Sequence, residues 1–184
     1  MSPRDIPNLL TALRVLLVLP AVWLMLEHRY ASALVVFGVA GLTDALDGFL
    51  ARRFGWQSRL GATLDPLADK LLAVSAYLVL GAQGVLPAWL VALVLARDLV
   101  IVAGSVAYHL RVERLEANPS RLSKLNTLLQ IVLVLTAMAA QVAPVPPAAL
   151  EGLVWAVAAT TLGSGIDYVW RWGRRARRVL GGGA

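Results

Sequence analysis

The chain has 184 residues, of which 59% are hydrophobic and 15% are charged, and its mean hydropathy is +0.71. A soluble domain carries about 25% charged residues, and one core of this size cannot hide so much apolar surface from water. The composition therefore excludes a disordered chain and argues against a soluble globule. The absence of cysteine excludes disulfide scaffolds, cysteine-based zinc sites and thiol nucleophiles. The net charge of +6 favours membrane orientation and contact with anionic lipid over nucleic acid.

Six apolar stretches follow one another along the chain, each long enough for a transmembrane helix. We predict membrane-spanning helices over residues 9–26, 30–50, 62–82, 87–109, 125–143 and 148–170. No break between them has the composition of an interdomain linker, so the prediction is a single all-α membrane domain over residues 1–184. A signal peptide over residues 1–26 is the alternative for the first stretch, although its removal would leave an odd number of spans.

Positive residues set the predicted orientation, because Lys and Arg beside span ends stay on the cytoplasmic side. Arg29 alone falls on one side. The other side receives Arg4, Arg14, Arg52, Arg53, Arg59, Arg111, Arg114, Arg121, Lys124, Arg171, Arg174, Arg175, Arg177 and Arg178. Both termini are therefore predicted to be cytoplasmic. The bias toward Arg, Ala and Leu indicates a GC-rich bacterial gene, so the expected location is the bacterial inner (cytoplasmic) membrane.

Four aspartates lie near the predicted cytoplasmic ends of the second and third spans, where each ionised group costs at least about 2.5 kcal/mol. Asp44 and Asp47 are three residues apart, and Asp65 and Asp69 are four apart. On helices each pair projects from one face, and the short loop makes the two helices antiparallel neighbours. The four carboxylates are expected to converge at a site that faces the cytoplasm.

This aspartate cluster predicts a divalent metal site. Four like charges in a low dielectric would take up protons unless a cation neutralised them. Oxygen ligands without nearby His or Cys favour Mg²⁺, Mn²⁺ or Ca²⁺ over Zn²⁺. The alternative is that the carboxylates pair with loop arginines such as Arg52, Arg53 and Arg59.

Small residues and one arginine accompany the aspartates. Gly48, Ala51 and Gly61 allow a ligand or a neighbouring helix to approach the backbone closely. Arg52 offers a planar fork of donors that suits a pair of phosphate oxygens. Plain helix packing and a membrane anchor are the respective alternatives.

The residues from Asp44 to Asp69 read DALDGFLAR, then eight residues, then GATLDPLAD. This pattern resembles the signature of the CDP-alcohol phosphotransferase family, and the six-span layout also agrees with that family. The resemblance implies that Asp69 is the general base. It implies that one or two Mg²⁺ or Mn²⁺ ions are held by Asp44, Asp47, Asp65 and Asp69. It also implies that the CDP group is seated by Asp44, Gly48, Ala51, Arg52 and Gly61.

The reaction implied by the resemblance is attack of an acceptor hydroxyl on the lipid-bearing phosphorus of CDP-diacylglycerol, with release of CMP, in a homodimeric enzyme. An in-line displacement needs charge neutralisation on the pyrophosphate and a positioned base, which metal ions and a carboxylate supply. The residues therefore suit this chemistry independently of the family. A cation or proton transporter is the alternative from another class, because intramembrane carboxylates are typical of transporters too.

Residues 120–130, which read SRLSKLNTLLQ, indicate which acceptor the enzyme uses. Phosphatidylglycerophosphate synthases of the family are expected to carry a second lysine where this chain has Asn126, so the stretch looks more like the cardiolipin synthases, whose acceptor is phosphatidylglycerol. A diester of one charge needs fewer cations than glycerol 3-phosphate. Glycerol 3-phosphate is the alternative, with Arg111 and Arg114 supplying the missing charge. The expected acceptor-binding residues are Arg14, Arg97, Arg121, Lys124 and Asn126.

Three further charged residues have alternatives of their own. Arg14 belongs to an opening, NLLTALR, that resembles the family members making glycerol-based lipids, but it also suits an interfacial helix with an anchoring arginine. Arg97 and Asp98 are either a mutual pair that pins helices or part of the acceptor pocket. Asp167 is interpreted as a polar group in helix packing.

Overall fold

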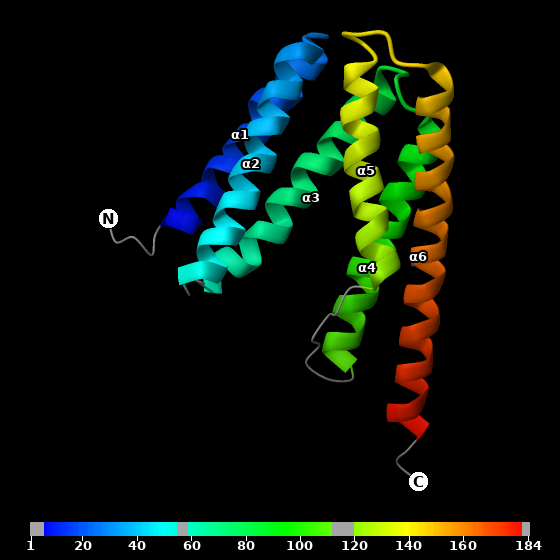
Figure 1. Cartoon of the computed structure of the whole chain (residues 1–184). Coiled ribbons are helices and arrows are strands. Elements are labelled where there is room, and N and C mark those ends of the chain that lie inside the picture. Colours follow the sequence, from blue (N-terminus) through cyan, green and yellow to red (C-terminus); the bar gives the residue numbers. More distant parts are fainter. Residues whose placement is uncertain (1–5, 55–58, 112–119, 182–184) are drawn as a thin grey trace. The chain divides into compact units, whose positions relative to one another are not determined.

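The computed structural model of the chain describes residues 6–54, 59–111 and 120–181, and the secondary structure in these ranges is entirely helical. Its helices are α1 (Ile6–Leu26), α2 (Tyr30–Phe54), α3 (Arg59–Ala82), α4 (Ala88–Arg111), α5 (Arg121–Ala139) and α6 (Pro147–Gly181) (Figure 1). The prediction of an all-α chain with a helix over each apolar stretch is confirmed for the described residues. The helix α6 continues to Gly181, well beyond its predicted end at residue 170.

Two helical stretches among the described residues are both long and apolar enough to cross a membrane, namely Arg121–Ala139 and Pro147–Arg171. Shorter apolar stretches cover Ala12–Leu26, Tyr30–Asp44 and Lys70–Ala82. Large apolar side chains are exposed on every helix, as at Leu19, Val35 and Leu99. Such surface is a liability in water and is typical of a protein that faces lipid. The number of spans and their orientation stay predictions.

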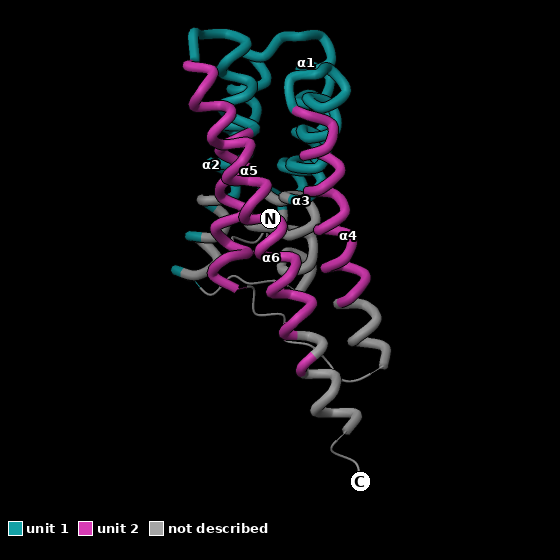
Figure 2. Tube along the Cα trace, turned by 90° about the vertical axis from the view of Figure 1, so that its right-hand side faces the viewer, with its two compact units in different colours: residues 1–86, 134–145 teal, residues 87–133, 146–184 magenta. Residues whose placement is uncertain are grey.

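The helices form two compact units, which Figure 2 colours separately. One unit comprises residues 1–86 and 134–145, and the other comprises residues 87–133 and 146–184. In the first unit α1 packs against both α2 and α3. In the second unit α4 packs against α6. The prediction of a single domain stays a prediction.

Small residues allow close helix packing within the first unit. Ala21, Ala33, Ala40 and Ala76 are fully buried on α1, α2 and α3. Small side chains at such contacts let helix backbones approach closely, which increases van der Waals contact where no hydrophobic effect drives association. The packing of α1 with its two neighbours therefore rests on alanines and not on bulky side chains alone.

The turn after α1 has a defined hydrogen-bonded cap. The amide of Arg29 donates to the carbonyl of Leu24 at 2.8 Å, and the amide of His28 donates to that of Met25 at 3.0 Å. His28 has φ of 56°, in the left-handed region. These features constitute a Schellman motif, which satisfies carbonyls at the helix end. The chain can therefore reverse into α2 within three residues.

The turn after α3 uses the same motif with a glycine. Gly84 has φ of 71°, and its amide donates to the carbonyl of Gly81 while the amide of Val85 donates to that of Leu80. Glycine adopts this conformation without steric cost. The turns after α1 and α3 are therefore closed by one mechanism.

The capped ends of α1 and α3 and the start of α2 are also tied together by side chains. Gln83 donates from Nε2 to the carbonyl of Met25 at 2.8 Å. The Tyr30 hydroxyl donates to Gln83 Oε1, also at 2.8 Å, and lies 3.2 Å from Nδ1 of His28. Residues 53 and 58 positions apart along the chain are thereby joined at one end of the first unit.

In the second unit, aromatic side chains connect α4 and α6 at two levels. The rings of Trp89 and Trp155 have their centroids 5.4 Å apart. Further along, the Tyr168 hydroxyl donates to the carbonyl of Ile101 at 2.9 Å. Gly104 makes room there, because a Cβ at this residue would lie 3.1 Å from the Tyr168 ring. The absence of a side chain at Gly104 is what permits this contact.

Candidate functional site

The four signature aspartates lie on helices, as their spacing predicts. Asp44 and Asp47 belong to α2, and Asp65 and Asp69 belong to α3. The spacings of three and four residues from which the sequence predicts a shared face therefore fall within helices. Seven of the predicted positions have side chains outside the described residues: Asp47, Gly48, Ala51, Arg52, Gly61, Asp65 and Asp69. The convergence of the four carboxylates therefore stays a prediction.

Asp44 pairs with a buried arginine on α1. Nη1 of Arg14 lies 2.8 Å from Oδ1 of Asp44, and the side chain of Arg14 is 1% exposed while that of Asp44 is 48% exposed. The sequence assigns Arg14 to the acceptor and Asp44 to the metal and the CDP group, and it does not predict that the two side chains pair. The signal for this pair is an arginine in an otherwise apolar helix, since such a charge calls for a carboxylate partner.

The exposed fraction of Asp44 leaves its carboxylate open to a ligand beside Arg14. Among the described side chains, no group of three or more His, Cys, Asp or Glu could hold a metal ion. The other three signature aspartates lie outside that set. Carboxylate oxygens are nevertheless the donors that Mg²⁺ and Mn²⁺ prefer. The chemistry of the signature residues thus fits these ions. One of these residues, Asp44, is oriented by its ion pair with Arg14.

The Arg14–Asp44 pair makes a prediction about stability. Asp44→Ala leaves the guanidinium of Arg14 buried without this partner, and loss of one member of a buried pair costs about 3 kcal/mol or somewhat more. Since Asp44 is half exposed, we expect a loss at or below the low end of that range. Arg14→Met removes the buried charge itself and should cost less. Thermal unfolding in detergent with EDTA present measures both effects without a metal contribution.

Asp167→Ala is the matched control for Asp44→Ala. Asp167 pairs with Arg171 one turn along α6 at 2.6 Å, but that arginine is well exposed. Pairs of this kind contribute about 0.5 kcal/mol, so the unfolding temperature should change little. Equal stability of Asp44→Ala and Asp167→Ala would show that the buried pair does not matter.

Arg97 links three helices of the second unit. Its Nη1 lies 2.8 Å from Oδ1 of the adjacent Asp98. Its Nε donates to Oγ of Ser164 on α6 at 3.1 Å, and its Nη2 donates to Oγ of Ser123 on α5 at 2.7 Å. The Arg97 side chain is 9% exposed. The structure therefore shows the mutual pair that pins helices, and a role of Arg97 in acceptor binding stays a prediction.

Asn126 is fully buried between α5 and α6. Its Oδ1 accepts hydrogen bonds from the hydroxyls of Thr160 and Thr161, each at 2.9 Å. Its Nδ2 has no hydrogen-bond partner among the described residues. A lysine at this position would bury an ammonium group, which is costly without a counter-charge. Asn126 thus packs helices together, and the expected contact with an acceptor is not tested by this geometry.

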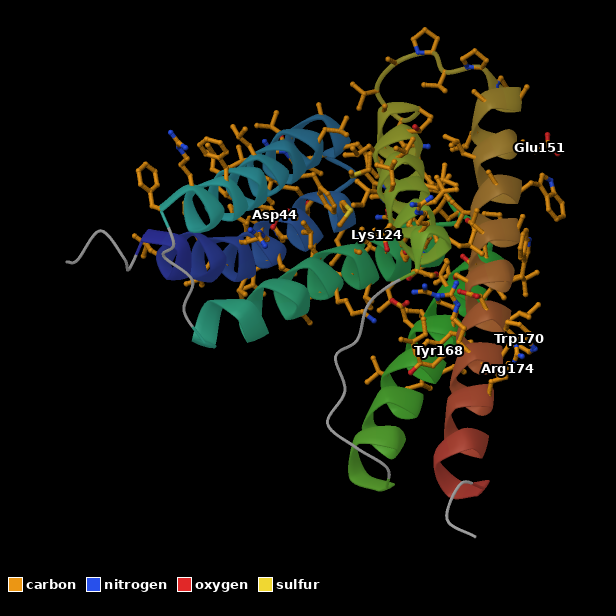
Figure 3. All side chains as sticks on the ribbon, turned by 60° about the horizontal axis from the view of Figure 1, so that its bottom comes forward. Asp44, Lys124, Glu151, Tyr168, Trp170 and Arg174 are labelled. Atoms are coloured by element: carbon orange, nitrogen blue, oxygen red, sulfur yellow. The ribbon has the colours of Figure 1, made fainter. Side chains whose placement is uncertain are left out.

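The start of α5 presents the remaining predicted cations. Arg121 and Lys124 are exposed in its first turns, and Figure 3 labels Lys124. The Ser120 hydroxyl accepts a hydrogen bond from the amide of Ser123 at 3.1 Å, which caps the helix. Sequence reasoning missed the hydroxyls that organise this region, at Ser123, Thr160, Thr161 and Ser164. Their signal is the spacing of three or four residues between Thr160, Thr161 and Ser164 on α6, which places them near one face.

The family model for CDP-alcohol phosphatidyltransferases matches residues 4–163, and the chain belongs to this family. Cardiolipin synthase (CMP-forming) from Rattus norvegicus is 33% identical over an alignment 199 residues long. The alignment covers 98% of this chain and 65% of that protein. A probable phosphatidylglycerophosphate synthase from Mycobacterium tuberculosis is 35% identical over 186 residues, covering 97% and 84%. Cardiolipin synthase (CMP-forming) from Streptomyces coelicolor is 38% identical over 112 residues, covering 56% and 52%.

The predicted membership of this family is thereby confirmed. The chain spans 65% of the length of the rat and human cardiolipin synthases that it matches. Relatives of similar identity carry both of the names that the sequence leaves open, cardiolipin synthase and phosphatidylglycerophosphate synthase. The comparisons therefore establish the class of protein, and the acceptor has to be argued from the site.

Proposed function

We propose that the chain transfers a phosphatidyl group from CDP-diacylglycerol to the hydroxyl of a glycerol-based acceptor and releases CMP. The observation that carries this proposal is the family match over residues 4–163, which includes all four signature aspartates. The match favours the transferase over the transporter that the intramembrane carboxylates also suggested. A divalent ion bound by Asp44, Asp47, Asp65 and Asp69 would neutralise charge on the pyrophosphate.

In the proposed reaction, the acceptor oxygen forms a bond to the phosphorus that carries the lipid. The bond from that phosphorus to the bridging oxygen breaks, and CMP leaves with that oxygen. The proton of the acceptor hydroxyl passes to the carboxylate of Asp69, which acts as general base. Arg14 orients Asp44 through their 2.8 Å ion pair. Gly48, Ala51, Arg52 and Gly61 seat the CDP group.

Phosphatidylglycerol is the acceptor that the described cations favour. The charge of Arg97 is balanced by Asp98, and the side chain of Asn126 is neutral and buried. Arg121 and Lys124 are the exposed cations of the described part of α5. The nearly double charge of a phosphate monoester calls for several converging cations, so this smaller set favours the single charge of a phosphodiester. The product is then cardiolipin, as in the name of the rat relative.

Glycerol 3-phosphate is the second candidate acceptor. The relative from Mycobacterium tuberculosis, named a probable phosphatidylglycerophosphate synthase, aligns with 97% of this chain. Arg114 lies outside the described residues, as does the side chain of Arg111. These two arginines would supply the additional positive charge.

The proposed membrane arrangement has six spans with both termini in the cytoplasm of a bacterial cell. Exposed apolar side chains on all the described helices support it. So does the lopsided distribution of Lys and Arg, with Arg29 alone at the opposite end. We propose in addition a homodimer, on the strength of the family resemblance.

The acceptor prediction is tested by giving the purified protein CDP-diacylglycerol, Mg²⁺ and each acceptor, with the lipid products identified by mass spectrometry. We expect cardiolipin and CMP from phosphatidylglycerol in preference to phosphatidylglycerophosphate from glycerol 3-phosphate. Lys124→Gln should raise the KM for phosphatidylglycerol by about fivefold, the factor for one cationic contact, with no change in the KM for CDP-diacylglycerol.

Arg29→Gln is the control for Lys124→Gln, because Arg29 is an exposed cation at the turn after α1, on the predicted opposite side of the membrane. It should leave both KM values unchanged. Synthesis of phosphatidylglycerophosphate without any cardiolipin would exclude phosphatidylglycerol as the acceptor. The absence of any CMP release would contradict the proposed reaction itself.

A further inference from the structure

An open groove runs between α4 and α6 in the second unit, with a volume of about 650 Å³. Its walls are mainly apolar and include Leu93 and Val100 from α4 and Ile166 and Val169 from α6. Gly165 also lines the groove, and its missing side chain helps to keep it open. The volume lies within the range of small-molecule binding sites in proteins.

One end of the groove is marked by an aromatic ring under a cation. Trp170 lines the groove, and the guanidinium carbon of Arg174 lies 4.5 Å from the centroid of the Trp170 ring. Figure 3 shows the two labelled residues together on the same part of α6. Arg174 is exposed and pairs with no carboxylate among the described residues, whereas Arg171 is engaged by Asp167.

The apolar groove and the Trp170–Arg174 pair together favour one kind of ligand in a membrane. A guanidinium stacked on an indole ring still presents the N–H donors at its edge to an anion. Tryptophan and arginine both prefer the boundary between hydrocarbon and water. An apolar groove that ends at such a pair matches a molecule with a long hydrocarbon part and an anionic head. Basic pockets between helices on the cytoplasmic side are known binding places for anionic phospholipid head groups.

We propose that the groove between α4 and α6 binds an anionic phospholipid, with an acyl chain along the apolar walls and the phosphate at Arg174. The observations are confined to one unit of the structure. Arg97, which the sequence assigns to the acceptor, also lines the groove, so the choice of lipid rests on the proposed function, whereas the labelling experiment below needs no turnover. The ligand is a phosphodiester lipid such as phosphatidylglycerol. Zwitterionic lipids fill the same apolar groove less favourably, because their ammonium group opposes the charge of Arg174.

A second copy of the chain is a less suitable occupant. Two copies in one membrane are related by an axis along the membrane normal, so a symmetric contact pairs equivalent surfaces at equal depth. The basic end of α6 would then face the same end of the second copy. This end carries Arg171 and Arg174, and Arg175, Arg177 and Arg178 follow in the sequence. Like charges in such a contact repel. An anionic lipid removes this repulsion and satisfies Arg174.

The experiment uses the full chain in phosphatidylcholine bilayers that contain a trace of phosphatidylglycerol with a photoactivatable acyl chain. We expect labelling of peptides from α4 and α6 that include Val100 and Val169. Unlabelled phosphatidylglycerol should compete about fivefold better than added phosphatidylcholine, the factor for one cationic contact at a membrane surface. Equal competition by the two lipids would overturn the proposal, as would labelling spread evenly over all helices.

Two variants separate the apolar groove from the cation. In Gly165→Leu the new Cβ lies 3.7 Å from Cγ of Arg97, an ordinary contact, so the rest of the side chain fills the groove. Labelling should fall at least fivefold. Gly152→Leu is the control, because a Cβ at Gly152 meets nothing within 4 Å and this residue does not line the groove. Equal labelling of both leucine variants would contradict the proposal.

The second variant, Arg174→Gln, changes an exposed side chain and should not disturb folding. It should retain labelling but lose the fivefold preference for phosphatidylglycerol, whereas Arg29→Gln keeps the preference. An unchanged preference in Arg174→Gln would exclude the phosphate contact. If wild-type protein is not labelled and Gly165→Leu breaks an oligomer into monomers, the groove holds a second copy and the lipid assignment is wrong.

Discussion

Exhaustive treatment with EDTA should abolish CMP release from CDP-diacylglycerol, and added Mg²⁺ or Mn²⁺ should restore it. The physical reason is the predicted convergence of Asp44, Asp47, Asp65 and Asp69 on one site, where four like charges repel one another and favour a bound cation. A metal ion also neutralises the pyrophosphate as it is broken. The measurement is the initial rate of CMP formation, together with metal analysis of the treated protein.

The control for chelation is EDTA that has been saturated with Mg²⁺ beforehand, which should leave the rate unchanged. A thermal unfolding curve of the treated protein separates loss of metal from loss of fold. Full activity in protein whose metal content is shown to be zero would refute the metal assignment. The family assignment would stand in that case, because it depends on the match over residues 4–163.

Asp69→Asn should lower turnover by about 10²-fold or more, the contribution typical of a general base. Asparagine has nearly the shape of aspartate but cannot accept the proton of the acceptor hydroxyl. Binding of CDP-diacylglycerol should fall less in this variant than in Asp44→Asn or Asp47→Asn. Steady-state kinetics and a direct binding measurement with CDP-diacylglycerol distinguish the two effects.

Asp167→Asn is a suitable control for the loss of a carboxylate, since Asp167 pairs with exposed Arg171 on α6 and has no assigned part in the reaction. It should keep nearly normal turnover. Near-normal turnover in Asp69→Asn as well would remove Asp69 from the role of base. A parallel loss of substrate binding and turnover in Asp69→Asn would instead assign it to metal or substrate binding alone.

The helices could be predicted from the sequence because long apolar stretches separated by short polar breaks leave few other structures in lipid. The end of α6 could not be predicted in this way. Apolar residues give way to a basic stretch at Arg171, yet the helix continues to Gly181. Arg, Ala and Leu are good helix formers, so helical propensity extends the structure past the point where hydropathy indicates a boundary.

The ion pair of Arg14 and the environment of Asn126 show where sequence reasoning was incomplete. An arginine in an apolar helix calls for a carboxylate, but the sequence contains four candidates and does not say which lies beside α1. The packing of α1 on α2 selects Asp44. Similarly, an amide at residue 126 suits a ligand or a neighbouring helix. The hydroxyls of Thr160 and Thr161 are supplied by α6, which the sequence alone does not align with α5.

The hydrogen bond between Tyr30 and Gln83 has a consequence at the other end of the first unit. Asp44 lies fourteen residues after Tyr30 on α2, and Asp69 lies fourteen residues before Gln83. At 1.5 Å per residue, both are about 21 Å along their helices from this bond. The bond therefore sets a common reference level for α2 and α3. Asp44 and Asp69 lie at the same distance from it along their respective helices. A one-residue insertion in either segment would shift its aspartates axially by about 1.5 Å and rotate them by about 100°.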